Sequence, residues 1–188
     1  TKCNLCNGNE LKPCSKYRCE SLGQTCEFIN EGTTNELCID NNPNDVMAPL
    51  ISPAYEIISQ GYEYSEVMDN IGFNINKKNE ECIQEYTPIV FGIDINEAAQ
   101  CKMDIESKAK YEEMEFFFGG SNSYIYNHTT LLNVPSLDAL GVPGVGPERR
   151  GEFKFYVRCQ DRNGNFNPNE YQINFCITPG IDKTPAVV

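Results

Sequence analysis

The chain has 188 residues, of which 15 are basic and 27 acidic, giving a formal net charge of −12. An acidic excess of this size repels nucleic-acid backbones and anionic lipid surfaces, so we expect neither as a partner. The apolar runs, of which residues 47–51 are typical, are too short to span a membrane. Cations and neutral glycans are compatible with the charge. The N-terminal residues show no signal peptide, so we expect a mature or excised form of a secreted protein.

Ten cysteines are the most informative feature of the composition, and six of them fall within the first 38 residues. An even number at this density predicts a disulfide framework, which persists in oxidising compartments. A structural zinc site in the N-terminal segment is the less favoured alternative, because nothing else in the sequence indicates a reducing compartment. We therefore expect a secreted or cell-surface protein. The expected disulfide cysteines are Cys3, Cys6, Cys14, Cys19, Cys26, Cys38, Cys82, Cys101, Cys159 and Cys176.

The composition changes along the chain and predicts three parts. Residues 1–43 are rich in Asn, Gly, Glu and Cys with few large apolar side chains, so this segment needs cross-links to fold as a small disulfide-rich cap. Residues 44–180 alternate short runs of Ile, Val, Phe and Tyr with turn residues, which is typical of an all-β sandwich. Residues 181–188 are expected to form a C-terminal strand or the start of a following repeat.

Several elements can be predicted within the second part. Strands are expected over residues 87–93, 99–105 and 124–132 from their apolar and β-branched runs. Residues 107–117 predict a short helix, and the glycine- and proline-rich residues 141–151 predict an irregular loop.

A β-hairpin over residues 153–177 is the clearest element. Apolar and polar residues alternate on both arms, and the pair Asn163-Gly164 between them tolerates the positive φ of a tight turn. On the first arm the alternation predicts that Lys154 and Arg158 point to solvent. The residues of this arm that are predicted to face the core are Phe153, Phe155, Val157 and Cys159.

Three motifs occur together in this chain: residues 155–165 read FYVRCQDRNGN, residues 96–101 read NEAAQC, and residues 182–188 read DKTPAVV. In these motifs the chain resembles the immunoglobulin-like or fibronectin type III-like repeats of prokaryotic, especially archaeal, cell-surface proteins. The resemblance covers roughly residues 85–188 and an opening strand at 45–53. It implies an immunoglobulin-like β-sandwich and a cell-surface context, without an activity.

The resemblance also implies part of the disulfide pairing. Cys101 and Cys159 would face one another within the body, and Cys82 with Cys176 would tie the first strand to the last. The six cysteines of the cap would then pair among themselves. The residues alone leave the pairing open.

Two insertions and one terminal segment stand out against the repeat pattern. Residues 55–85 and 141–151 depart from the plain repeat, so an individual function is expected there. The apolar run that ends the sequence resembles the first strand of a following repeat, and we expect it to insert into a neighbouring copy by strand addition. The residues of this assembly strand are Thr184, Pro185, Ala186, Val187 and Val188.

Two loops rich in Asp and Asn, residues 40–45 and 161–165, offer oxygen ligands of the kind that calcium prefers. Neither loop has the spacing of an EF-hand. Turn formation is the simpler interpretation, because Asp and Asn side chains hydrogen-bond their own backbone. No other cofactor is expected. The expected ligands of a calcium ion are Asp40, Asn42 and Asp45.

No catalytic residue is expected. His128 is the only histidine and lies in an N-glycosylation acceptor sequence, which predicts glycosylation of Asn127 and a surface position for His128. An acid and base pair for glycoside hydrolysis is disfavoured against the solvated face of the predicted helix for Glu112, Glu113 and Glu115. Core packing is favoured over a sugar-binding platform for Tyr62, Tyr64, Tyr124 and Tyr126.

These features together favour a non-enzymatic extracellular module with a structural or adhesive role in a cell-surface assembly or filament. Its expected partners are other copies of the chain or neighbouring repeats of the same surface protein, joined by strand-mediated contacts. A glycan-binding or calcium-dependent binding module is the alternative. An enzyme is disfavoured because no segment meets the requirements of a catalytic site.

Overall fold

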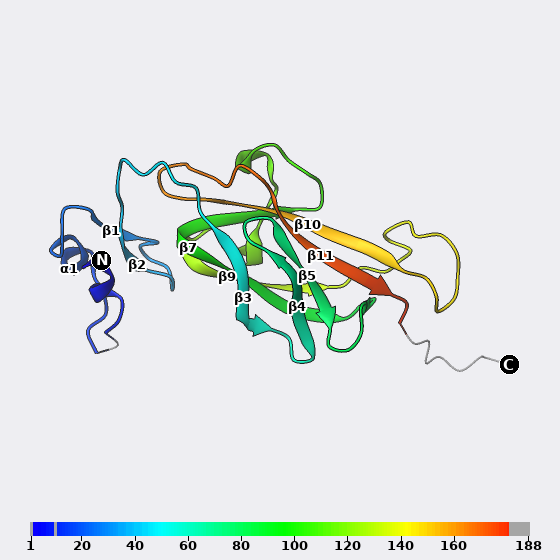
Figure 1. The fold of residues 1–188 in the computed structure, drawn as a ribbon. Coiled ribbons are helices and arrows are strands. Elements are labelled where there is room, and N and C mark those ends of the chain that lie inside the picture. The colour runs from blue at the N-terminus through cyan, green and yellow to red at the C-terminus, as the bar shows by residue number, and fades with distance from the viewer. Residues whose placement is uncertain (1, 10, 181–188) are drawn as a thin grey trace.

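The computed structural model describes residues 2–9 and 11–180 of the chain, which form a small N-terminal cap and a larger β body (Figure 1). The cap contains the 3₁₀ turn η1 (Cys3–Cys6), the helix α1 (Lys16–Glu20) and the strands β1 (Cys26–Ile29) and β2 (Leu37–Asp40). The strands of the body are β3 (Ile51–Ile58), β4 (Tyr62–Met68), β5 (Gly72–Lys77), β6 (Ile83–Gln84), β7 (Pro88–Asp104), β8 (Phe116–Phe117), β9 (Ile125–Asn133), β10 (Gly151–Gln160) and β11 (Tyr171–Thr178). Its 3₁₀ turns are η2 (Tyr111–Glu113) and η3 (Phe118–Gly120). The predicted all-β class with a disulfide-rich cap is confirmed.

The long strand β7 belongs to two groups of strands. Its first half pairs with β3 and β9, and its second half pairs with β8 and β10. From β10 the pairing continues through β11 and β5 to β4, and β11 runs parallel to β5. The two groups share one core, in which the ring centroids of Phe91 on β7 and Phe175 on β11 lie 5.5 Å apart. The specifically immunoglobulin-like topology stays a prediction.

The hairpin predicted over residues 153–177 is present as β10 and β11. The strands are antiparallel, with Phe153 opposite Phe175, and the turn that follows β10 has Gly164 in the left-handed region (φ 88°). Of the residues predicted to face the core, Phe153 is half-buried and the others are buried. This part of the sequence prediction is confirmed.

Arg158 requires a correction, because its side chain is buried and does not point to solvent. The guanidinium donates hydrogen bonds to the carbonyl oxygens of Lys108, Asn167 and Pro168. A guanidinium stays charged in proteins, so a buried one needs acceptors of this kind. Two of these acceptors belong to the connection between β10 and β11, which folds back over this face of β10. Alternation within one strand does not reveal such a covering segment.

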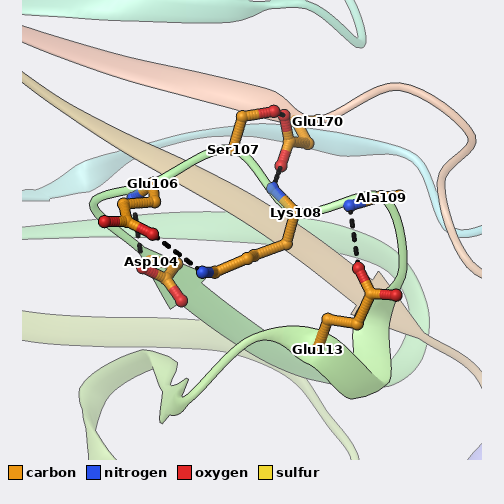
Figure 2. A network of polar contacts seen from close by, with 7 residues as sticks. All are labelled: Asp104, Glu106, Ser107, Lys108, Ala109, Glu113 and Glu170. Carbon is orange, nitrogen blue, oxygen red and sulfur yellow. Dashed lines mark hydrogen bonds and ion pairs between the residues drawn. The ribbon is translucent and has the colours of Figure 1, made fainter.

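Residues 107–117 do not form the predicted helix. They run as a loop that contains only the single turn η2 and the short strand β8, which pairs with β7. Glu170 accepts hydrogen bonds from the backbone N–H of Lys108 and from the hydroxyl of Ser107 (Figure 2). These distant partners satisfy the segment outside a helix, so its local helix propensity does not prevail.

Two disulfides cross-link the body in the pairing that the resemblance implied. Cys101 on β7 lies directly opposite Cys159 on β10, with their Cα atoms 4.0 Å apart. Cys176 on β11 is bonded to Cys82. One detail differs from the expectation: Cys82 does not lie on the first strand but precedes β6, which pairs in parallel with β11. This disulfide therefore fastens a neighbouring segment to the last strand.

The other three disulfides lie within the cap. They join Cys3 to Cys26, Cys6 to Cys14 and Cys19 to Cys38. The cystines form most of the cap's interior, against which Leu22 and Phe28 pack. Because few other apolar side chains are available there, covalent links take the place of a larger hydrophobic core.

The ten cysteines all pair, and a framework of five disulfides is typical of secreted or extracellular proteins. Within the described part of the chain, no helix is long and apolar enough to cross a membrane. The predicted assembly strand, residues 184–188, lies outside the described residues.

Three substitutions on β10 should show how differently its core, buried polar and outer side chains contribute to stability. Phe155→Ala should lower the free energy of unfolding by ~3–5 kcal/mol, because it opens a cavity in the core. Arg158→Ala should lower it by ~1–3 kcal/mol, because buried carbonyl oxygens lose their donor. Lys154→Ala, outside the core, should change it by less than about 0.5 kcal/mol. Urea unfolding followed by circular dichroism measures all three, and an Arg158→Ala effect as small as that of Lys154→Ala would contradict the buried guanidinium.

Candidate functional site

The junction between the cap and the body is the strongest candidate site. It is formed by the linker (residues 40–45) and the turn that follows β10. Asn163 Nδ2 in this turn donates a hydrogen bond to the carbonyl oxygen of Asn42 (2.8 Å), and Asn165 Nδ2 donates to that of Asp45 (2.9 Å). The two Asp- and Asn-rich loops that the sequence identified separately therefore lie against each other.

The buried side chain of Asp161 stabilises the turn by hydrogen bonds to its backbone. The residue is only 4% exposed. Oδ1 accepts hydrogen bonds from the backbone N–H groups of Asn163 and Asn165, each at 2.8 Å, and Oδ2 accepts one from Asn165 Nδ2. A side chain that bonds the backbone two residues on is the usual device of an Asx turn.

The linker uses its polar side chains in the same way. Asn42 Oδ1 accepts from the backbone N–H of Asn44 (3.1 Å), and Asp45 Oδ1 accepts from that of Met47 (2.9 Å). Asp40 is exposed at the end of β2. Turn formation thus describes much of what these predicted calcium ligands do.

Three carboxylates nevertheless converge at the junction. Asp45, Glu97 and Asp161 each bring one oxygen atom to within 4.8 Å of the others, and we call them the carboxylate cluster. Glu97 projects from the middle of β7, where the pairing of this strand with β9 is interrupted. The cluster borders a small hollow of about 50 Å³, whose lining also includes Asp40 and Asn42.

Glu97 was not identified from the sequence as a site residue. A carboxylate within a long, mostly apolar strand was the available signal, because acidic side chains are rarely buried without a partner. Its neighbours in the cluster lie 52 and 64 positions away in the chain, at Asp45 and Asp161. No local pattern brings such residues together.

The convergence changes the protonation of Glu97. Burial, together with the nearby carboxylates of Asp161 and Asp45, raises the pKa of Glu97 to about 7. Burial and then the charge of Glu97 raise the pKa of Tyr126, which also faces the hollow. Arg162 lies at the same hollow, but its guanidinium forms an ion pair with Glu27 of the cap. Glu97 therefore gains and loses its proton near neutral pH.

The cap is held to the body by polar and apolar contacts. Arg162 of the turn pairs with Glu27 and lies over the ring of Tyr124. Asn30 Nδ2 donates to the carbonyl oxygen of Tyr124, and its Oδ1 accepts from the N–H of the same residue, both at 2.8 Å. The apolar side chains packed between the two parts are Ile29, Leu37, Ile39, Ala98, Tyr124 and Tyr126.

Chemically, three carboxylates around a small polar hollow suit a hard cation that prefers oxygen ligands, such as calcium. Of the three ligands predicted from the sequence, Asp45 belongs to the cluster, and the other two line the hollow beside it. An acidic cluster alone does not establish a metal site, so the calcium site stays a prediction.

The predicted glycosylation site and its neighbour lie on opposite faces of β9. Asn127 is exposed, and its Nδ2 donates to Asp94 Oδ1 (2.6 Å). His128 is buried, with 1% of the residue exposed, which corrects the expected surface position. Successive residues of a strand alternate between faces, so an exposed Asn127 places His128 inside. Burial lowers the pKa of His128, whose Nε2 lies 3.0 Å from the carbonyl oxygen of Ala99.

The acidic residues near η2 serve the loop that contains them. Figure 2 shows Glu113 accepting a hydrogen bond from the backbone N–H of Ala109 (3.1 Å). In the same loop Lys108 Nζ pairs with Glu106, and the N–H of Glu106 donates to Asp104 Oδ1. The expected helical face is absent because the helix is absent, and Glu113 acts as a local backbone acceptor.

Comparison with protein-family models, with curated proteins and with solved structures finds no match for this chain. The resemblance to cell-surface repeats stays a hypothesis based on the sequence motifs.

Glu97→Gln should stabilise the protein above neutral pH. The pKa of about 7 in the folded state lies above the ordinary value of 4.5, so ionisation of Glu97 removes stability as the pH rises between these values. Glutamine carries no charge, and its advantage should grow from near zero at acidic pH to about 1 kcal/mol at alkaline pH, because water screens the half-exposed group. Thermal unfolding against pH measures this advantage. Glu56→Gln, on the exposed face of β3, is the control.

An advantage of Glu97→Gln that does not change between acidic and alkaline pH would contradict the raised pKa. The same variant tests the calcium prediction. Millimolar calcium chloride at alkaline pH should raise the melting temperature of the wild-type protein and have a smaller effect on Glu97→Gln, because a ligand that binds only the folded state stabilises it. A wild-type melting temperature that does not respond to calcium would rule out the predicted ion.

Proposed function

We propose that the chain is a non-enzymatic structural or adhesive module of an extracellular, cell-surface assembly, in which copies contact one another end to end. The observation that supports this proposal is the position of the two ends of the described chain. The cap lies at one end of the molecule, and β11 runs toward the opposite end (Figure 1). A module whose polypeptide chain begins at one end of the molecule and runs to the opposite end is suited to linear arrays.

The cross-links support a mechanical role. Disulfides close spans of 94 and 58 residues within the body, and three more hold the cap. Each disulfide typically contributes ~2–4 kcal/mol, chiefly by restricting the unfolded chain. A module stabilised in this way tolerates conditions outside the cell that would unfold a core of similar size.

The junction supports the same role. Hydrogen bonds from the turn to the linker backbone, the ion pair of Arg162 with Glu27 and the apolar contacts fix the cap on the body. A cap that is fixed in orientation can pass a contact with one neighbour to the body behind it. A cap on a free linker would not.

The contact between copies is proposed to form by strand addition. Residues 184–188 are the proposed donor strand. Among the described strands, β3 and β4 lie at the two ends of the main path of pairing and are the proposed acceptors, because an edge strand presents unpaired backbone groups. A contact of this head-to-tail kind does not close unless the rotation forms a ring, so it propagates a filament.

Deletion of residues 183–188 should abolish assembly and leave the fold intact. Negative-stain electron microscopy and size-exclusion chromatography compare the whole chain with the deletion variant, and circular dichroism with thermal unfolding checks the fold. The double substitution Val187→Asp and Val188→Asp should act like the deletion, because charges at these positions oppose burial of the strand. Lys183→Ala is the control and should assemble normally. A whole chain that stays monomeric, or a deletion variant that assembles like the whole chain, would contradict the proposal.

A further inference from the structure

A groove of about 760 Å³ runs across the outer face of the strands β4, β5, β11 and β10. Its polar residues lie on the side away from the core, since Asn74 and Asn174 alternate with the buried Phe73 and Ile173. The lining also includes the core residues Phe153 and Phe175. The volume is typical of sites that hold small ligands, for which about 300–1,000 Å³ is usual. The insertion over residues 55–85 lines it with Asn74, and Leu140 and Glu152, which flank the insertion over residues 141–151, line it as well.

Asparagine amides form the floor of this groove, which we call the amide groove. Asn is disfavoured in strands, yet Asn74, Asn76 and Asn174 all line this one face. Asn174 Nδ2 donates to Asn74 Oδ1 (3.0 Å), Asn74 Nδ2 donates to Glu66 Oε2 (2.7 Å), and Asn76 Nδ2 donates to Ser65 Oγ (2.9 Å). These bonds hold the amides in fixed orientations.

One amide oxygen on the floor lacks a partner. The Oδ1 atom of Asn174 is shielded from water and accepts no hydrogen bond from the described residues. A shielded acceptor without a donor is unfavourable, and such groups in folded proteins call for a specific explanation. Because the atom is shielded, a ligand hydroxyl could donate to it only after the Asn174 side chain turns this oxygen toward the groove.

Glu66 is directed at the floor by an irregularity in β4. The pairing of β4 with β5 shifts between Ser65 and Met68, and Glu66 has a φ of 48°, in the left-handed region that a glutamate seldom adopts. A bulge of this kind re-aims a side chain, and unfavourable backbone conformations occur preferentially at functional sites. Here the bulge allows the Glu66 carboxylate to accept a hydrogen bond from the side-chain amide of Asn74.

The charges of the groove exclude anionic ligands. The lining contains three carboxylates and one ammonium group, so its net charge is negative and would repel phosphates, sulfates and uronates. Beside these polar groups, Tyr156 and Ile105 provide an apolar edge, and Ile105 is 60% exposed. The charged residues of the lining are Glu66, Glu81, Glu152 and Lys154.

We propose that the amide groove binds a neutral oligosaccharide. Each sugar hydroxyl both donates and accepts a hydrogen bond, and the amides and carboxylates of the floor offer both roles at fixed positions. The C–H face of a sugar ring is apolar and packs on an aromatic side chain, and the half-buried Tyr156, whose ring lies beside the Lys154 ammonium, is one such partner in the lining. This proposal adds a binding activity to the structural role and does not depend on it.

A basic peptide is the other ligand that an acidic groove attracts. Lys154 opposes it, because the ammonium lies in the groove and donates to Gln172 Oε1 (3.0 Å), where it would repel lysine and arginine side chains. The row of amides also carries no charge and would add little to the binding of a cation. The lining therefore favours a neutral ligand with many hydroxyl groups.

The test begins with the labelled whole chain on an array of neutral and uronate-containing oligosaccharides. The neutral hexasaccharide retained best is then titrated by NMR, with hexalysine and a uronate hexasaccharide as the competing probes. Backbone shifts should gather on β4, β5, β10 and β11 for the neutral sugar. Asn74→Ala and Tyr156→Ala should each weaken binding by about tenfold, since each removes a hydrogen-bonding or packing partner. Asn127→Ala, an exposed asparagine on β9, should leave the affinity unchanged.

Circular dichroism and thermal unfolding establish that each variant is folded. The NMR shifts of the wild-type chain locate the binding site independently of the variants. Retention of no neutral sugar on the array would overturn the proposal. Shifts that gather away from the amide groove would overturn it as well, as would hexalysine binding at these strands in place of every neutral probe.

Discussion

The turn that follows β10 connects the body to both the linker and the cap. Asp161 holds the turn from inside, and the amides of Asn163 and Asn165 reach across to carbonyl oxygens of the linker. Because the acceptors are backbone atoms, these bonds constrain the path of the linker and not merely one side chain. Arg162 of the same turn pairs with Glu27 of the cap. This one short turn therefore contributes to the orientation of the cap, together with the hydrogen bonds between Asn30 and Tyr124 and the apolar contacts.

This arrangement places like charges together. The turn carries Asp161, the linker carries Asp45, and both approach Glu97, which keeps its proton to near neutral pH. Glu97 and Asp161 cannot easily move apart to reduce their repulsion. The disulfide between Cys101 and Cys159 joins β7 close to Glu97 and β10 close to Asp161. The repulsion therefore acts mainly on the linker. Protonation, or a bound cation, is the remaining way to reduce it, which makes the junction the pH-responsive part of an otherwise cross-linked molecule.

Features that depend on local pattern were predictable from the sequence, and features that depend on distant segments were not. The alternation along β10 and β11 identified their hairpin, because a period of two needs no knowledge of neighbours. The same alternation wrongly predicted that Arg158 points to solvent. The segment that covers this side chain comes after the turn that follows β10, so the pattern of β10 alone does not reveal it. Local propensity predicts a helix over residues 107–117, and it fails because their partner Glu170 is remote in the chain. At the junction both loops were found, whereas Glu97 was missed because only the fold places it beside them.

The parallel pairing of β11 with β5 has a comparable effect on the outer face of the sheet. It sets Asn174 beside Asn74, 100 positions earlier, and so forms the floor of the amide groove. The groove lies on a side face, whereas the cap and the end of β11 lie at the two ends of the molecule (Figure 1). Strand addition at β3, which does not line the groove, would leave every groove open. A linear assembly would then present one groove per copy at regular intervals, and weak binding of single sugars would add up to strong attachment through multivalency.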